Sequence, residues 1–125
     1  MNLYKTKWFH RWAAREGLTD AALWTAVMEL EQGLADALGG NVYKKRIGLP
    51  GRGKRGSVRT LIAFRQGERA FFMYGYPKNE RANISNDDLK ALRLLAKELL
   101  GYNEQGLAKA VKAGELIEVN DDGKT

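Results

Sequence analysis

Basic residues are concentrated in the middle of this 125-residue chain. Between positions 43 and 69 there are nine cations and one acid, Glu68. The nine are Lys44, Lys45, Arg46, Arg52, Lys54, Arg55, Arg59, Arg65 and Arg69. Glycines at 51, 53 and 56 lie among them and let backbone N–H groups approach a phosphate closely. Such a segment is typical of proteins that bind phosphate backbones, although a merely solvated charged loop has the same composition.

A second cluster follows the last apolar strand that the sequence predicts. Tyr76, Lys78 and Arg81 could converge there with Arg59, one strand away. RNA cleavage through the ribose 2′-hydroxyl needs a base for the hydroxyl proton, a cation for the phosphorane charge and an acid for the leaving oxygen. Arginine stays charged and can only stabilise, whereas a lysine among other cations loses its proton more readily. The cluster suits an RNA-cleaving site, but Lys78 and Arg81 could equally cap the connection to the next helix.

Other chemistries find little support. The chain has no cysteine and one histidine, His10, which excludes thiolate metal sites, two-histidine ribonuclease catalysis and serine triads. The acids form no metal-ligand grouping near the basic segment, so no metal or cofactor is expected. The glycine-rich run at 51–56 lacks the strand and helix of a phosphate-binding P-loop. A net charge of +6 favours a polyanionic partner.

Local signals predict two helices near the N-terminus. Thr6 suits the N-cap of a helix that ends at Gly17, and Thr19 or Asp20 can open a second helix. An apolar stripe at helical spacing extends this second helix to the glycine pair at 39–40. The stripe consists of Leu23, Val27, Leu30, Leu34 and Leu38.

Strands are predicted in the middle of the chain. The run 41–47 and the two runs 57–65 and 69–76 are rich in β-branched and aromatic residues, and the last two form a hairpin. Because these two runs are apolar on both faces, we expect them inside a sheet with helices covering one side. Leu3 and Tyr4 could begin a short edge strand.

The C-terminal third is predicted to be mainly helical. Ser85 and Asp88 form a capping-box pattern for a helix that Gly101 ends. A short helix over 104–113 and a strand over 115–119 follow.

The order of helices, strands and helices indicates the α+β class. We expect one domain over 1–125, with a helical part at 1–40, an antiparallel sheet at 41–76 and a helical extension at 85–119. No signal peptide or membrane-spanning run is found, so we expect a cytoplasmic protein without membrane contact.

Several segments, in this order, resemble the RelE/HigB toxins of type II toxin–antitoxin systems. They are Lys5-Thr6-Lys7-Trp8-Phe9, Val42-Tyr43-Lys44-Lys45-Arg46-Ile47, the glycine-rich 51–56 loop, Arg59-Thr60-Leu61-Ile62-Ala63-Phe64, and the run from Arg69 to Tyr76 with Lys78. The resemblance implies two N-terminal helices packed on a small antiparallel sheet, with the C-terminal helices as additions. It also implies metal-independent cleavage of messenger RNA on the ribosome, and neutralisation by a cognate antitoxin, expected to be of the helix-turn-helix type.

The resemblance also implies roles for single residues. Arg59 matches the strand arginine that contacts the scissile phosphate in that family. The predicted catalytic set is Arg59, Lys54, Lys78 and Arg81. The predicted RNA-binding set is Lys44, Lys45, Arg46, Arg52, Arg55 and Tyr76, with Tyr76 as the candidate for base stacking.

Two alternatives remain open on the sequence. The ParE branch shares this fold and inhibits DNA gyrase without cutting RNA, and fold does not separate the two activities. The second alternative is a family member without catalytic activity that binds only nucleic acid or its antitoxin. The dense basic segment with Lys78 and Arg81 favours RNA.

Overall fold

A computed structural model describes residues 1–49, 56–78 and 84–120 of the chain. Within these ranges it has six strands and four helices. The strands are β1 (Asn2–Thr6), β2 (Asp36–Ala37), β3 (Val42–Gly48), β4 (Ser57–Arg65), β5 (Arg69–Pro77) and β6 (Leu116–Glu118). The helices are α1 (Lys7–Glu16), α2 (Asp20–Glu31), α3 (Asn86–Leu100) and α4 (Glu104–Lys112). The α+β class is confirmed.

The strands form one mixed sheet in the order β2-β3-β4-β5-β1-β6. Strand β1 runs parallel to β5, while every other neighbouring pair is antiparallel. The predicted antiparallel sheet over 41–76 is thus confirmed for β3, β4 and β5, but the whole sheet is mixed because β1 adds a parallel strand. The prediction that the Leu3 segment is an edge strand is wrong, because β6 returns from the C-terminal part and pairs with the outer side of β1.

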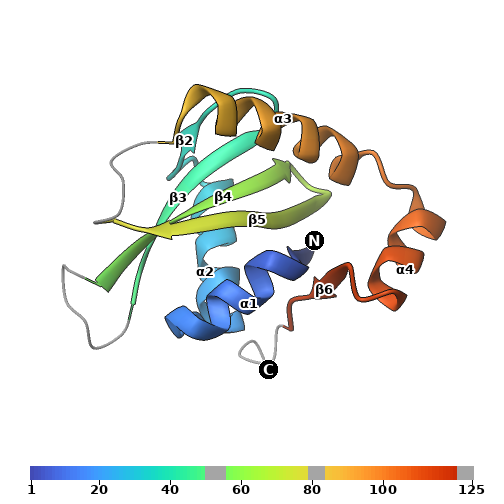
Figure 1. Ribbon diagram of the computed structural model, residues 1–125, viewed down its shortest axis with the longest axis horizontal. Coiled ribbons are helices and arrows are strands. Elements are labelled where there is room, and N and C mark those ends of the chain that lie inside the picture. Colours follow the sequence, from blue (N-terminus) through green and yellow to red (C-terminus); the bar gives the residue numbers. More distant parts are fainter. Residues whose placement is uncertain (50–55, 79–83, 121–125) are drawn as a thin grey trace.

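Helices cover both faces of the sheet, as Figure 1 shows with α3 on one side and α1 and α2 on the other. Strand β4 supplies apolar side chains to both: Leu61 belongs to the core under α3, and Ile62 to the core over α1 and α2. Successive side chains of a strand point to opposite faces, so a strand that is apolar throughout must be covered twice. The expectation of helices on one side only is thus corrected.

Helix α1 begins and ends where the local signals predict. The Thr6 side chain accepts a hydrogen bond from the Phe9 N–H at 3.1 Å, and its hydroxyl donates to the Met73 carbonyl of β5. Gly17 follows the helix with φ of 78°, a left-handed conformation that glycine adopts without strain. One threonine therefore starts the helix and also joins it to the sheet.

Helix α2 is shorter than its apolar stripe predicts. It ends at Glu31, and Gly33 has a φ of 85°, which turns the chain away. Leu34 is 56% exposed, and Leu38 packs instead with the core on the α3 side of the sheet. The prediction that this helix reaches the glycines at 39–40 is wrong, because the chain must leave it to build β2.

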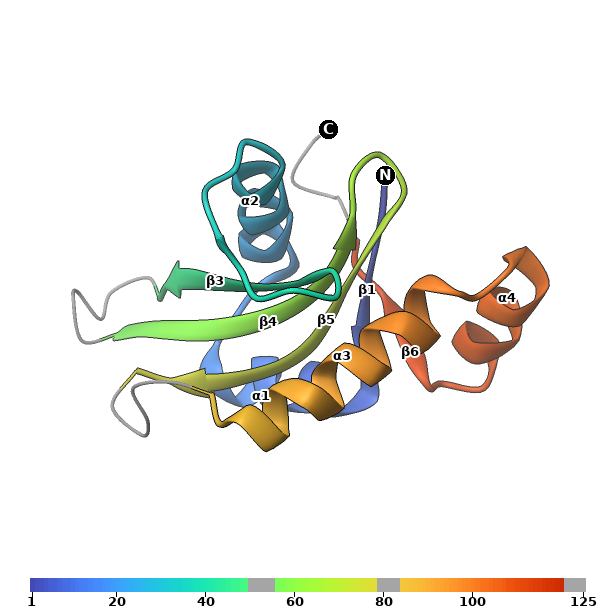
Figure 2. The same cartoon turned by 90° about the horizontal axis from the view of Figure 1, so that it is seen from above.

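The C-terminal elements extend the structure beyond the central strands. The Ser85 hydroxyl accepts from the Asp88 N–H and starts α3, as predicted. Helix α4 then projects at one end of the molecule, next to β6 (Figure 2). No helix in the described part of the chain is long and apolar enough to cross a membrane.

Candidate nucleic-acid interface

Three cations lie on one face of the paired strands β3 and β4. Lys44 and Arg46 follow Val42 by two and four residues, so their side chains leave the sheet on the same face as this core residue. Arg59 lies directly opposite Arg46 in the register of the two strands. We call Lys44, Arg46 and Arg59 the basic patch.

The basic patch lies at the end of the sheet that the helices leave open. Helix α3 covers this face through Ala96 and Leu99, which share a core with Val42 and Ala63 near the other end of the strands. The paired ends of β3 and β4 extend beyond α2 and α3 (Figure 2). Arg46 is exposed, and Lys44 and Arg59 are half-buried. A ligand can therefore reach all three from solvent.

Few acids neutralise the basic patch. The Lys44 Nζ lies 3.7 Å from a carboxylate oxygen of the exposed Asp36, a separation at which a surface pair contributes little. The Arg59 guanidinium donates to the Ser57 hydroxyl at 3.4 Å. In the described ranges, no carboxylate forms an ion pair with Arg46 or Arg59. Like charges directly opposite on neighbouring strands are destabilising, so Arg46 and Arg59 together favour an anion between them.

Sequence reasoning did not single out Ser57 as a site residue. It precedes Arg59 by two residues in β4, so the two side chains share a face. Ser57 is buried, and its contact holds one end of the guanidinium. The i, i+2 spacing within a predicted strand is the signal that would have found it.

Lys45 does not belong to the basic patch. It lies between Lys44 and Arg46 in the strand and therefore points to the opposite face. Its Nζ forms an ion pair with Glu29 of α2 at 3.0 Å and donates to the Leu34 carbonyl at 2.9 Å. The expected RNA-binding role of Lys45 conflicts with these contacts, which give it the task of holding the end of α2.

Tyr76 is beside Arg59 but is not available for stacking. It is the register partner of Arg59 on β5, as the sequence reasoning required. However, it is only 2% exposed and belongs to the core under α3. The prediction that its ring stacks on a base is corrected. Lys78 is exposed immediately after β5, at the same end of the sheet as Arg59.

Two other cations of the basic segment lie at the opposite end of the β4–β5 hairpin. Arg65 pairs with Glu68 at 3.8 Å. Arg69 donates to the Tyr102 carbonyl at 2.7 Å and to Glu104 at 2.9 Å. Arg69 thereby ties the hairpin to α4 and takes no part in the basic patch.

The remaining predicted site residues are Arg52, Lys54, Arg55 and Arg81, and all four lie outside the described residues. Over the residues that are described, no group of three or more histidine, cysteine or acidic side chains could hold a metal ion.

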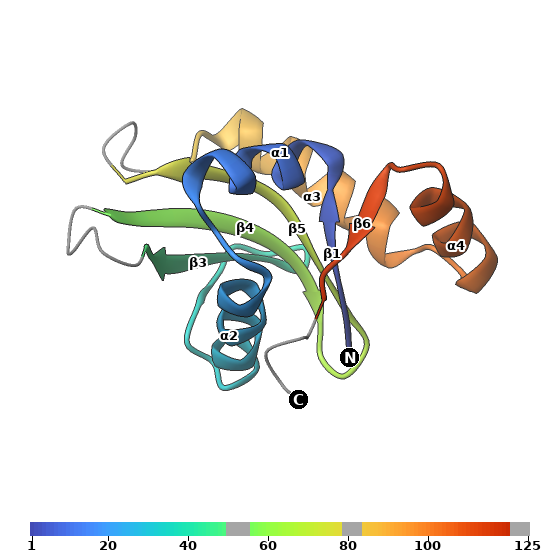
Figure 3. The ribbon, with the colours of Figure 1, turned by 90° about the horizontal axis from the view of Figure 1, so that it is seen from below.

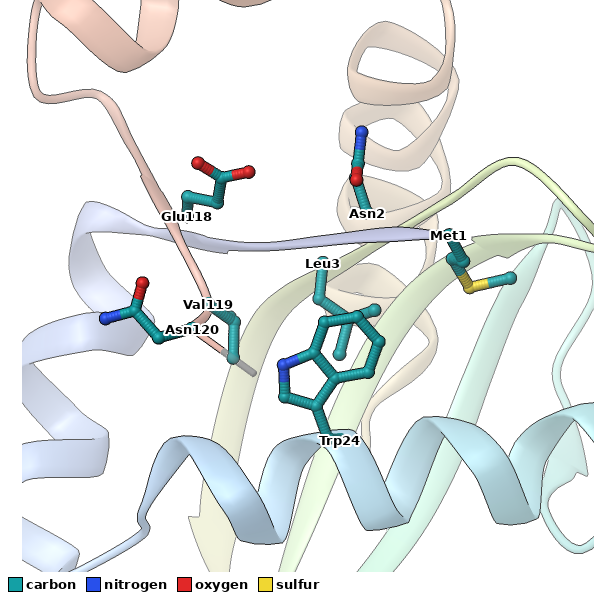
Figure 4. Close-up of a pocket in the computed structure, with 7 residues that line it drawn as sticks. All are labelled: Met1, Asn2, Leu3, Trp24, Glu118, Val119 and Asn120. Carbon is teal, nitrogen blue, oxygen red and sulfur yellow. The ribbon is translucent and has the colours of Figure 1, made fainter. Parts of the chain in front are cut away.

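A pocket near the N-terminus is chemically different from the basic patch. It has a volume of about 310 Å³ and lies between β1, β6 and α2, with the Trp24 indole over Leu3 and Val119 (Figure 4). Among its described lining residues, Glu118 carries the one charged side chain. This pocket is therefore unsuited to a phosphate.

The fold and the basic patch together define a class: a small α+β protein that carries cations from neighbouring strands on one accessible face of its sheet. The family model described as the RelE toxin of the RelE / RelB toxin–antitoxin system matches residues 1–119. The chain belongs to this RelE toxin family. A comparison with curated proteins finds no matching relative.

Proposed function

We propose that this chain is the toxin of a type II toxin–antitoxin pair and cleaves messenger RNA on the ribosome. A cognate antitoxin, which we expect to be of the helix-turn-helix type, keeps it inactive. The observation that carries this proposal is the Arg46–Arg59 pair, which faces solvent across β3 and β4 without an acidic partner among the described residues. Membership of the RelE toxin family supports the toxin role.

In the proposed reaction the ribose 2′-hydroxyl attacks the adjacent phosphorus, and the bond to the leaving 5′-oxygen breaks. Arg59 stabilises the charge that develops on the phosphorane oxygens, because its guanidinium stays protonated throughout. Ser57 holds this guanidinium in place. Lys44 and Arg46 bind the neighbouring phosphates. Lys78, exposed just after β5, is the described residue that we expect to exchange a proton with the reacting oxygens. Lys54 is a second candidate for this role, whereas Arg81 can only stabilise charge.

An Arg59→Ala variant tests this proposal. Removing one preorganised electrostatic contact should reduce cleavage by about 10²–10³-fold. The experiment induces the wild-type chain and the variant without antitoxin, measures the translation rate, and maps the 5′ ends of cellular messages. Arg65→Ala is the matched control, because Arg65 lies on the same strand with its side chain tied to Glu68 at the other end.

Several outcomes would contradict the proposal. Unchanged cleavage in a folded Arg59→Ala protein would remove Arg59 from the site. Intact messages with a DNA-damage response would indicate gyrase inhibition instead. Ribosome binding should weaken steeply with salt, and a flat dependence would count against phosphate contacts.

A further inference from the structure

A second cationic surface lies on α1. Lys7, Arg11 and Arg15 are exposed and spaced i, i+4, i+8, so they form one stripe along the helix. Like charges at this spacing destabilise a helix. Lys7 is also at the positive end of the helix dipole, and no acid occupies the first turn of α1. Arg15, in the last turn, is favourably placed in the dipole, so the cost comes from the like-charge spacing and from Lys7, and an anion bound along the stripe would offset it.

An aromatic cleft adjoins this stripe. The ring of Trp8 stacks on Tyr74 of β5 with centroids 4.6 Å apart, and on Trp12 at 5.9 Å. Trp8 is nevertheless 44% exposed. The cleft has a volume of about 330 Å³ and is lined by Trp8, Trp12, Arg15, Glu16, Tyr74, Gly75, Tyr76 and Pro77. This volume is at the lower end of the ~300–1,000 Å³ typical of small-molecule sites.

The sheet leaves the cleft open. Strand β1 pairs with β5 only as far as Phe72, so among the described strands the edge of β5 beyond this residue has no neighbour on that side. Helix α1 runs beside this edge (Figure 3). Met73 is an extra residue in the register between β4 and β5, a bulge next to Tyr74. Gly75 leaves room for the Trp12 ring, since a Cβ at Gly75 would lie 2.3 Å from Trp12 Cζ3.

We infer that this cleft, defined as the α1–β5 cleft, binds a nucleotide of single-stranded RNA. Proteins that hold single strands combine a cationic track for phosphates with aromatic faces on which bases stack. Here the exposed part of the Trp8 ring receives the base, and Arg11 and Arg15 contact the flanking phosphates. The cleft reaches Tyr76 and Pro77, next to Arg59 across the β4–β5 pair, so one strand of RNA can contact both surfaces.

The binding test uses the purified full chain and a labelled oligoribonucleotide, with affinity measured by fluorescence anisotropy. Trp8→Ala should weaken binding at least fivefold, and Trp8→Phe should restore most of the loss, because a stacking face is retained. Affinity falls as salt rises, and each phosphate contact adds about 0.7 to the steepness of log affinity against log salt. The double variant Arg11→Ala with Arg15→Ala should therefore reduce this steepness by about 1.4. Lys109→Ala with Lys112→Ala on α4 removes the same charge elsewhere and should leave the slope unchanged.

A further arm identifies the source of the RNA. If Trp8→Ala weakens binding to ribosomes that carry no message, the cleft contacts ribosomal RNA. If Trp8→Ala weakens binding only to ribosomes that carry a message, the cleft contacts the message. Equal oligonucleotide affinity of wild type and Trp8→Ala, with folding verified by circular dichroism, would overturn the inference. So would a Trp8→Ala variant that loses only antitoxin binding, since the cleft would then serve a protein. The anisotropy test needs no cleavage, so its result is independent of the Arg59→Ala result.

Discussion

At the scale of single residues, the direction in which a side chain leaves its strand separates functional from structural roles. Lys44 and Lys45 are neighbours of the same type, yet one joins the basic patch and the other ties β3 to α2. Tyr74 and Tyr76 leave β5 on the same face, yet Tyr74 is half-buried beside Trp8 and Tyr76 is in the core under α3. The role of a residue in this sheet thus depends on which face it occupies and on what covers that face.

A buried tyrosine gives the first prediction at this scale. Burial, and then the nearby Glu118 carboxylate, raise the pKa of Tyr4 above its ordinary value of 10.0. The folded state therefore keeps the phenol proton at a pH where the unfolded chain has lost it. This contribution to stability is complete below pH 10 and is lost as pH rises through the folded-state pKa.

We expect the free energy of unfolding to fall as pH rises above 10, and to fall less steeply in Tyr4→Phe. Urea unfolding followed by circular dichroism between pH 8 and pH 11, values chosen to bracket the ordinary tyrosine pKa of about 10, measures both slopes. Identical slopes in the two proteins would show that Tyr4 does not contribute.

At the scale of elements, close packing between α1 and β5 shapes the cleft beside the sheet edge. The helix is fixed at its start by the Thr6 bond to Met73 and in its middle by the Trp12 ring over Gly75. The edge of β5 has no described strand partner beyond Phe72, and the packing of α1 along this edge positions Trp8 over Tyr74.

Gly75→Ala tests this packing. The added Cβ would lie 2.3 Å from Trp12 Cζ3, so the ring must move, and we expect a loss of about 1–3 kcal/mol in the free energy of unfolding. Tryptophan fluorescence should change as well. Gly48→Ala is the control, because a Cβ added to this residue of β3 would meet no described atom within 4 Å. Equal stability of the two variants would contradict the account.

At the scale of the whole molecule, Asp20 joins three parts that are distant in sequence. One carboxylate oxygen pairs with the Lys5 Nζ of β1 at 3.1 Å, and the other accepts from the Asn120 N–H at 2.9 Å. The Lys5 side chain is only 8% exposed. The same carboxylate therefore connects the start of α2, strand β1 and the segment after β6.

Asp20→Ala should destabilise the protein by about 1–3 kcal/mol, because it leaves the nearly buried Lys5 ammonium without its partner. The cost is below that of a fully buried ion pair, because Asp20 is partly exposed. The midpoint of urea unfolding measures this. Lys5→Met combined with Asp20→Ala should recover part of the loss, since the unpaired charge is gone. A double variant less stable than Asp20→Ala would argue against the explanation.

Signals that act over a few residues were sufficient for much of the secondary structure. Helix α1 begins after Thr6 and ends at Gly17, and Ser85 starts α3, as predicted. The two apolar runs form the predicted β4–β5 hairpin. These features depend on hydrogen bonds and backbone conformations within one or two turns of the chain. Residue types alone also predicted the concentration of cations on β3 and β4.

Only the tertiary structure decided how those elements meet. The parallel placement of β1 beside β5, the return of β6 and the covering of both sheet faces depend on contacts between residues far apart in sequence. The same long-range contacts assigned Lys45 to Glu29, buried Tyr76 and left Arg46 beside Arg59 in solvent. The sequence by itself therefore determined the local elements and the charge of this protein, whereas the packing of helices on each face determined which of its cations a ligand can reach.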